Sequence, residues 1–213
     1  MPNWVTNKVM MPWEAMEQCL STDTEDGKDY FDFNKIIPRP KIIEIKFNGG
    51  TERVAKEIVR LKKEGKAYAM MLVGLNDEEK DLVHQMIKCH EETGYLHWYD
   101  WCVGNWGTKW NTAEPMKIEG DTIVFDTAWN APLPVLKKAS EIHQCRIVHW
   151  WADEDTGYNV GQSIFENGKE VCVLDLSCTR VGYELAFVLT GNGDSFKFNE
   201  ETGEYEMKEE VDE

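Results

Sequence analysis

A segment of regularly alternating side chains places the strongest limit on the fold of this chain. Residues 121–129 read DTIVFDTAW, with the apolar Ile123 and Phe125 separated by a single residue. This period of two predicts a half-buried β-strand. Residues 145–153 (CRIVHWWAD) are interpreted as the next strand, and three later segments as further β-structure joined by turn residues. These segments are residues 158–167, 170–177 and 183–191.

Helical patterns occur before and between these strands. Residues 51–65 carry apolar side chains at positions i, i+4 and i+7, and residues 76–93 form a second apolar stripe after the capping residue Asn76. Prolines introduce a third helix at residues 132–144. Trp4–Met11 alternates loosely and is expected to be an edge strand. The sequence therefore predicts an α+β fold, with helices on one face of an antiparallel sheet.

The chain is expected to form a single α+β domain over residues 1–198, with a helical insert at about 51–94. Residues 199–213 are expected to be an acidic C-terminal tail. A small hairpin that turns at Thr202-Gly203 is expected at its start. No apolar run approaches the ~20 residues that cross a bilayer, and the first residues lack the pattern of a secretion signal. We therefore expect a protein of a host cell's cytoplasm with no membrane partner.

Several uncommon strings, most of them rich in tryptophan, recur together along the chain. They are MPNW followed by Asn7, FDFNKIIPRP at 31–40, WYDW and NWGTKW at 98–110, FDTAWNAPLP at 125–134, and FENG at 165–168. In this order they resemble the YubB ferredoxin-like domain family of phage and plasmid proteins. The resemblance covers most of the chain and implies a ferredoxin-like core and a mobile genetic element as the source. It implies no catalytic residues, because the family offers none to carry over.

The chain is strongly acidic, with 39 Asp and Glu against 23 Lys and Arg and a net charge of −16. Direct binding of a nucleic-acid duplex through its phosphates requires a basic face, so we expect no such binding. An acidic protein can instead present carboxylates, in place of phosphates, to a partner that normally binds nucleic acid. That alternative stays open.

Common catalytic and metal-binding signatures are absent from the sequence. It contains no Walker, GxSxG or kinase motif, and no histidine has a His or Cys partner at the spacing of a zinc site. The six cysteines include no CxxC pair, which argues against a thiolate metal cage or a disulfide framework. We assign no catalytic residue, metal or cofactor. Carboxylates at Asp126 and Asp153–Asp155 are the alternative that an enzyme would use.

Nine tryptophans are many for a chain of 213 residues. An indole tends to sit where one face is apolar and one edge is wet, and it can stack on nucleobases for about 1–3 kcal/mol per base. We predict a ligand-binding pocket lined by indoles, with amide and ammonium donors at its rim. Its residues are Asn105, Trp106, Lys109, Trp110, Trp129, Trp150 and Trp151. The alternative is a structural corner in which the indoles lock loops onto the core.

Three functional hypotheses follow. The first is a phage or mobile-element counter-defence protein that binds and sequesters a nucleotide-derived immune signal in the tryptophan-rich pocket without catalysis. The second is an acidic inhibitor that binds a host defence protein or nucleic-acid-binding protein by charge mimicry. The third is a hydrolase of a nucleotide signal. Small binding proteins often close a pocket by dimerising, so a homo-oligomer stays open as well.

Overall fold

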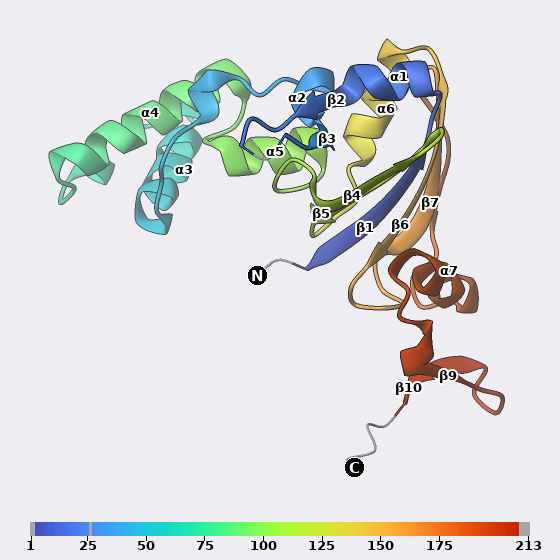
Figure 1. Ribbon diagram of the computed structural model, residues 1–213. Helices are drawn as coiled ribbons and strands as arrows, with labels where there is room; N and C mark the ends of the chain where they lie inside the picture. Colours follow the sequence, from blue (N-terminus) through green and yellow to red (C-terminus); the bar gives the residue numbers. More distant parts are fainter. Residues whose placement is uncertain (1–2, 26, 209–213) are drawn as a thin grey trace. The chain divides into compact units, whose positions relative to one another are not determined.

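The structure is a computed structural model that describes residues 3–25 and 27–208. The chain divides into two compact units, and Figure 1 shows their elements. One unit comprises Met1–Pro38 and Trp106–Glu213 and is called the sheet unit below. The other comprises Arg39–Asn105 and is called the helical unit. The insert expected at about 51–94 lies within the helical unit.

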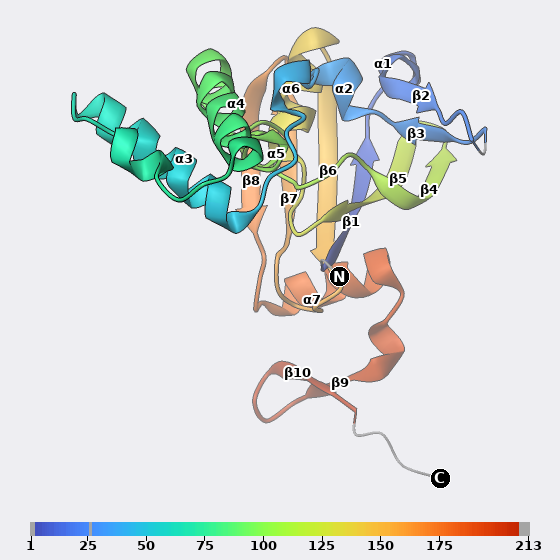
Figure 2. The same cartoon turned by 90° about the vertical axis from the view of Figure 1, so that its left-hand side faces the viewer.

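The sheet unit is built on a six-stranded sheet in the order β4-β5-β1-β6-β7-β8, in which all neighbours are antiparallel (Figure 2). Its strands are β1 (Trp4–Met10), β4 (Ala113–Glu119), β5 (Thr122–Ala128), β6 (Arg146–Asp153), β7 (Val160–Glu166) and β8 (Lys169–Asp175). Two short hairpins pair β2 (Leu20–Thr22) with β3 (Asp29–Phe31), and β9 (Phe196–Asn199) with β10 (Glu204–Met207). The predicted α+β class with its antiparallel sheet is confirmed.

Strand β1 lies inside the sheet, between β5 and β6, so the prediction of an edge strand is wrong. Its inward positions are Val5, Asn7 and Val9, all fully buried. The alternation looks loose in the sequence because one of these positions is polar. Asn7 donates a hydrogen bond from Nδ2 to Thr127 Oγ1 at 2.8 Å and is hydrogen-bonded through Oδ1 to His149 Nε2 at 3.0 Å. These partners satisfy the amide that β1 buries.

Helices cover the two faces of the sheet unequally. Trp151 and Ala152 are neighbours in β6 and therefore point to opposite faces. Trp151 packs with Val5 and with Leu133 at the start of α6 (Leu133–Ile142). Ala152 packs with Ala186 of α7 (Arg180–Thr190) on the other face. Helix α6 therefore covers the Trp151 face, and α7 covers one end of the opposite face.

Aromatic side chains fill the core on the Trp151 face. Phe31 stacks on Phe125 with ring centroids 5.4 Å apart, and Phe33 contacts both Phe125 and Trp106 edge-on. Residues 31–40 contain the short helix α2 (Phe33–Ile36), which follows α1 (Trp13–Cys19) in the chain. Phe31, Phe33 and Ile36 are buried.

The prediction of a β-segment at residues 183–191 is wrong, because this stretch forms helix α7. Gly182 and Ala186 are buried four residues apart, as a helix requires. Thr179 caps the start by accepting a hydrogen bond from Gly182 N at 3.0 Å, and Gly191 ends the helix with φ of +76°. The apolar run fits either period, and the capping residues decide in favour of a helix.

The hairpin expected at the start of the C-terminal tail is present as β9 and β10. Tyr205 of β10 packs on Phe187 and Tyr183 of α7, with ring centroids 5.0 and 5.5 Å apart. Residues up to Lys208 are therefore folded, while residues 209–213 of the expected tail lie outside the described part of the chain.

The helical unit contains three α-helices and two 3₁₀ turns among its described residues. They are η1 (Lys41–Ile43), α3 (Gly49–Lys63), η2 (Ala69–Leu72), α4 (Asp77–Thr93) and α5 (Trp98–Trp106), whose last residue belongs to the sheet unit. Asn76 caps α4 as predicted, and Asn48 caps α3 in a capping box with Thr51. Within the described residues, no helix combines the length and apolar character that crossing a bilayer requires.

Candidate ligand-binding surface

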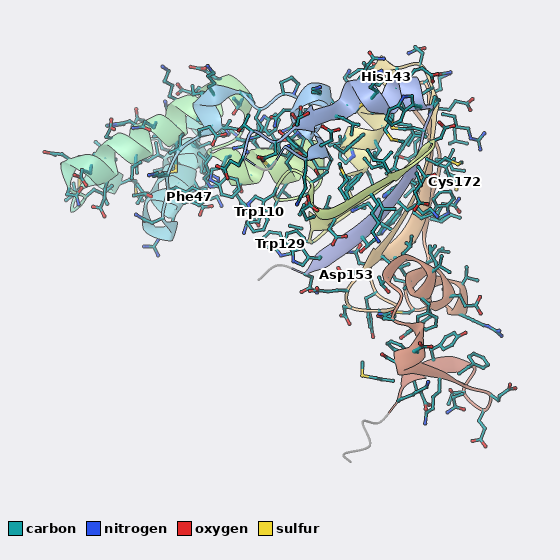
Figure 3. All side chains as sticks on the ribbon, viewed as in Figure 1. Phe47, Trp110, Trp129, His143, Asp153 and Cys172 are labelled. Carbon is teal, nitrogen blue, oxygen red and sulfur yellow. The ribbon has the colours of Figure 1, made fainter. Side chains whose placement is uncertain are left out.

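Three indole rings and one lysine come together at one end of the sheet. The Lys109 ammonium lies 4.2 Å from the Trp110 ring centroid and 4.7 Å from that of Trp129. The Trp4 ring lies 6.2 Å from the Trp110 ring, with the planes tilted by 39°. Figure 3 labels Trp110 and Trp129 near this end of β1. We call these four residues the indole–lysine cluster.

The loop that carries Lys109 and Trp110 is fixed by the residues before them. Gly107 has φ of +81°, and a Cβ there would lie 2.9 Å from Pro134 Cδ, closer than real contacts allow. Thr108 is buried and donates a hydrogen bond from Oγ1 to the carbonyl of Ala128 at 2.7 Å. The glycine therefore permits a close approach to the first turn of α6, and the threonine ties the loop to the end of β5.

Trp129 holds an unusual backbone conformation within the cluster. Its φ is +73°, a left-handed value that is a genuine outlier for a bulky residue. Its N–H donates to the carbonyl of Asn3 at 2.9 Å, and its carbonyl accepts from Asn159 Nδ2 at 2.9 Å. These bonds hold the strained conformation from both sides. Such strain tends to collect at functional sites.

Asp153 organises the loops beneath the cluster. Its side chain accepts hydrogen bonds from Asn159 Nδ2 at 3.0 Å, from the Asp155 N–H at 2.9 Å and from Asn3 Nδ2 at 3.4 Å. Because Asn3 and Asn159 also hold the backbone of Trp129, this carboxylate supports the position of the indole. With 5% exposure it serves as a structural acceptor.

The structure brings together only part of the predicted pocket. Lys109, Trp110 and Trp129 are neighbours, with Trp110 37% exposed and the other two partly buried. Trp106 is fully buried, and its indole N–H donates to the carbonyl of Ile37 at 2.9 Å. It belongs to the aromatic core, as the alternative of a structural corner predicts.

The other three predicted residues make their hydrogen bonds, ring contacts or strand pairs with residues outside the cluster. Asn105 donates from Nδ2 to the carbonyl of Trp101 within α5. Trp151 is 6% exposed and stacks on His149 with centroids 5.2 Å apart. Trp150 is partly exposed on the opposite sheet face, paired with Lys8 and Gln162. A single pocket cannot contain both Trp150 and Trp151, because neighbours in a strand point to opposite faces.

A cavity of about 430 Å³ begins at Trp4 and was not predicted from the sequence. It is lined by Trp4, Thr6, Lys117, Val124, Asp126, Glu154, Leu189, Thr190 and Asn192. Asp126 Oδ1 is buried there without a hydrogen-bond partner. Burial raises the pKa of the Asp126 carboxyl, a hydrogen bond from Thr6 opposes this shift, and the nearby Glu154 adds to it. Trp4 therefore belongs to both the cavity and the indole–lysine cluster.

Among the carboxylates considered for hydrolysis, Glu154 lines the same cavity as Asp126, but Asp153 does not pair with Asp126. Thr6 pairs with Asp126 and the adjacent Val5 pairs with Asp153, so the two acids lie on opposite faces of the sheet. Another candidate arrangement is the chain of Ser163, His149 and Asn7, joined by contacts of 3.0 Å. All three side chains are fully buried, so this arrangement holds the core and cannot reach a substrate.

Comparison with known proteins supports the fold. Residues 105–185, less than half of the chain, match a family model described as the ferredoxin-like domain in Api92-like protein. The ferredoxin-like class that the sequence predicted is therefore confirmed. The crystal structure of protein api92 from Yersinia pseudotuberculosis is similar at 9% identity with a TM-score of 0.41, over 82% of this chain and 98% of that one. No curated protein matches the chain.

Proposed function

We propose that this chain is a non-catalytic binding protein that captures a nucleotide-type ligand at the indole–lysine cluster. The observation that carries this proposal is the position of the Lys109 ammonium, 4.2 and 4.7 Å from two indole rings that converge from separate parts of the chain. Following the resemblance to the YubB family, we propose that the protein comes from a phage or plasmid. Its role there is to sequester a nucleotide-derived immune signal of the host.

The cluster offers both chemical groups that a nucleotide needs. Indole faces stack on any nucleobase, and each stack contributes about 1–3 kcal/mol. The Lys109 ammonium now lies over the rings in cation–π contacts. A nucleobase that enters the cluster would stack on the rings in place of this ammonium, which would then bind a phosphate of the same ligand. The partial exposure of Trp110 leaves an entry route.

The adjoining cavity extends the surface with polar groups of the right kind. Its volume of about 430 Å³ lies within the range of small-molecule sites. The unpaired Asp126 Oδ1 can accept a hydrogen bond from an exocyclic amine or ring N–H of a base. Lys117, at the same cavity, supplies a second cation for phosphate.

The experiment is a titration of the purified protein with cyclic, linear and ADP-ribose-type nucleotides, followed by tryptophan fluorescence. We expect one nucleotide class to quench the emission, and mass spectrometry after heat release to recover it intact. Lys109→Ala and Trp110→Ala should weaken capture at least about tenfold, if each group contributes some 1.4 kcal/mol. Trp13→Ala is the matched control, because it removes an indole of similar exposure (40%) from α1, beyond the other end of β1. Altered nucleotide after release would indicate a hydrolase, and binding lost equally in the control would refute this site.

A second candidate rests on the net charge of −16. In this version the acidic surface docks on a host protein that normally binds nucleic acid. Such a contact would be weakened by salt, since exposed charges are screened beyond about 8 Å at physiological ionic strength. Salt-sensitive co-purification with a nucleic-acid-binding protein, together with no response to any nucleotide, would favour it over capture of a small ligand.

A further inference from the structure

The helical unit contains a histidine whose ring nitrogens make no hydrogen bond to any described residue. His97 is fully buried, and neither Nδ1 nor Nε2 makes a hydrogen bond. A buried polar group left unsatisfied costs about 1–3 kcal/mol. A ligand that binds one of these nitrogens would remove that cost.

Two carboxylates face the free nitrogen of this imidazole. His97 Nε2 lies 3.6 Å from Glu52 Oε1 and 3.7 Å from Asp100 Oδ2. One ligand atom from each of the three residues lies within 4.8 Å of the other two. The contacts of 3.6 and 3.7 Å are too long for good hydrogen bonds, but they suit three groups that surround a common centre.

The local structure holds the imidazole in this position. Its ring stacks on Phe47, with centroids 3.6 Å apart and planes 4° from parallel; Phe47 is labelled on the helical unit in Figure 3. The carbonyl of His97 accepts the Trp101 N–H at the start of α5. Asp100 follows three residues later, on the same side of the helix, and Glu52 comes from α3.

We propose that Glu52, His97 and Asp100 bind a divalent transition-metal ion, with Zn²⁺ as the best fit. One imidazole nitrogen and two carboxylate oxygens are ligands that Zn²⁺ accepts, and water would complete its coordination. At zinc–ligand distances of about 2.0–2.2 Å, tetrahedral ligands lie roughly 3.3–3.6 Å apart. The separations of 3.6 and 3.7 Å between His97 Nε2 and the two carboxylate oxygens are close to that value.

The two carboxylates also provide a route of entry. Their side chains are 21% and 31% exposed, while His97 is fully buried, so an ion can reach the site from solvent and then meet the nitrogen. The imidazole selects against Mg²⁺ and Ca²⁺, which prefer sets of oxygen ligands. The site lies in the helical unit and is independent of the function proposed for the sheet unit.

Lys56 is the natural competitor for this ion. Its ammonium forms an ion pair with Glu52, one turn earlier on α3. Both His97 Nε2 and the Lys56 ammonium contact Oε1 of Glu52, so the ammonium and the ion compete for that oxygen. Removing the Lys56 ammonium should therefore raise the affinity for Zn²⁺, whereas removing the charge of Asp100 should lower it.

The test is a competitive titration of the full chain with Zn²⁺, with metal content per chain and the visible absorption of the Co²⁺ form as readouts. We expect one ion per chain with the spectrum of nitrogen and oxygen ligands, and no saturable binding of Mg²⁺ or Ca²⁺. His97→Gln and Asp100→Asn should each bind Zn²⁺ at least about tenfold more weakly. Lys56→Gln should bind it more tightly. His84→Gln, on the exposed side of α4, is the control and should bind like the unsubstituted protein.

Circular dichroism and thermal midpoints would establish that each variant is folded. If His97→Gln unfolds, Asp100→Asn carries the test, because that residue is partly exposed and the substitution keeps its shape. Unchanged Zn²⁺ affinity in a folded Asp100→Asn protein would overturn the proposal. So would binding that disappears when the cysteines are alkylated, or a Lys56→Gln protein that binds no more tightly.

Discussion

Asn7 Oδ1 and His149 Nε2 lie 3.0 Å apart in the core of the sheet, and each side chain completes the hydrogen bonding of the other. Through Thr127 on one side and Ser163 on the other, the polar chain crosses four adjacent strands. A fully satisfied buried network of this kind specifies one strand register, because a slip by one residue would leave every member without a partner.

Asn7→Ala should destabilise the sheet unit by about 2–3 kcal/mol. The substitution leaves a nitrogen of His149 and an acceptor position on Thr127 buried without a partner, and each such group costs about 1–3 kcal/mol. Urea unfolding monitored by circular dichroism gives the free energy of unfolding. Lys8→Ala, on the opposite face of the same strand, should change it by less than about 0.5 kcal/mol. Equal effects of the two substitutions would contradict a structural role for the network.

Stability should also depend on pH through His149. Burial lowers the pKa of this imidazole to about 3, against 6.5 for an ordinary histidine. As the pH falls below 6.5, His149 takes up a proton in the unfolded chain, whereas in the folded chain it stays neutral until about pH 3. The free energy of unfolding therefore decreases as the pH falls from 6.5 to 3. The stabilisation that comes from keeping His149 neutral is fully present above pH 6.5. About 2 kcal/mol of it is lost on going from pH 7 to pH 5.

The matched variant for this effect is His149→Gln, which stays polar but does not titrate. It should be less stable than the unsubstituted protein at pH 7, and the gap should narrow by about 2 kcal/mol at pH 5. Paired urea titrations at the two pH values measure the change. A gap that stays constant would mean that folding leaves the pKa of His149 at its ordinary value of 6.5.

Substitutions at two tryptophans only four residues apart should separate stability from binding. Trp106→Ala removes a fully buried ring and should cost about 3–5 kcal/mol in the free energy of unfolding. Trp110→Ala removes a ring that is 37% exposed and should cost less than about 1.5 kcal/mol while it abolishes most nucleotide quenching. Thermal unfolding and fluorescence titration of the same samples provide both readouts. Similar destabilisation by both changes would assign Trp110 to the core.

The left-handed backbone of Trp129 predicts an unusual order of stabilities. Trp129→Ala and Trp129→Gly both remove the indole, but alanine keeps the Cβ atom that this conformation strains. The glycine variant should therefore be the more stable by about 1 kcal/mol, opposite to the order in a helix or strand. Denaturant midpoints of the two variants decide the matter. A more stable alanine variant would show that the backbone relaxes once the indole is gone.

Local signals in the sequence were enough to predict much of the fold. The alternation at residues 121–129 and the capping residue at 76 each lie within one element, so neighbouring residues determine the outcome. The prediction of a strand at residues 183–191 was wrong because their apolar run fits a helix and a strand equally well. The prediction that β1 is an edge strand was wrong because a buried Asn7 needs a hydrogen-bond partner, and that partner is His149, 142 positions away.

The candidate sites depend more heavily on long-range contacts. Residue type pointed to tryptophan, but only the fold separates the buried Trp106 from the exposed Trp110. The opposite orientation of Trp150 and Trp151 could have been deduced from the strand pattern alone. Trp4 gave no signal because its partner Trp110 lies on an element distant in sequence. His97 and Asp100 are only three residues apart, but their third partner, Glu52, lies 45 residues before His97.

The interior place of β1 has a consequence for how the protein is made. Thr6 pairs with Asp126 on one side and Ala152 on the other, so β1 is synthesised before partners that follow more than a hundred residues later. At synthesis rates of about 5–20 residues per second, the nascent strand waits on the order of 10 s with Val5 and Val9 uncovered. During that interval its apolar side chains are open to chaperones, and the centre of the sheet can form only after β5 and β6 have been synthesised.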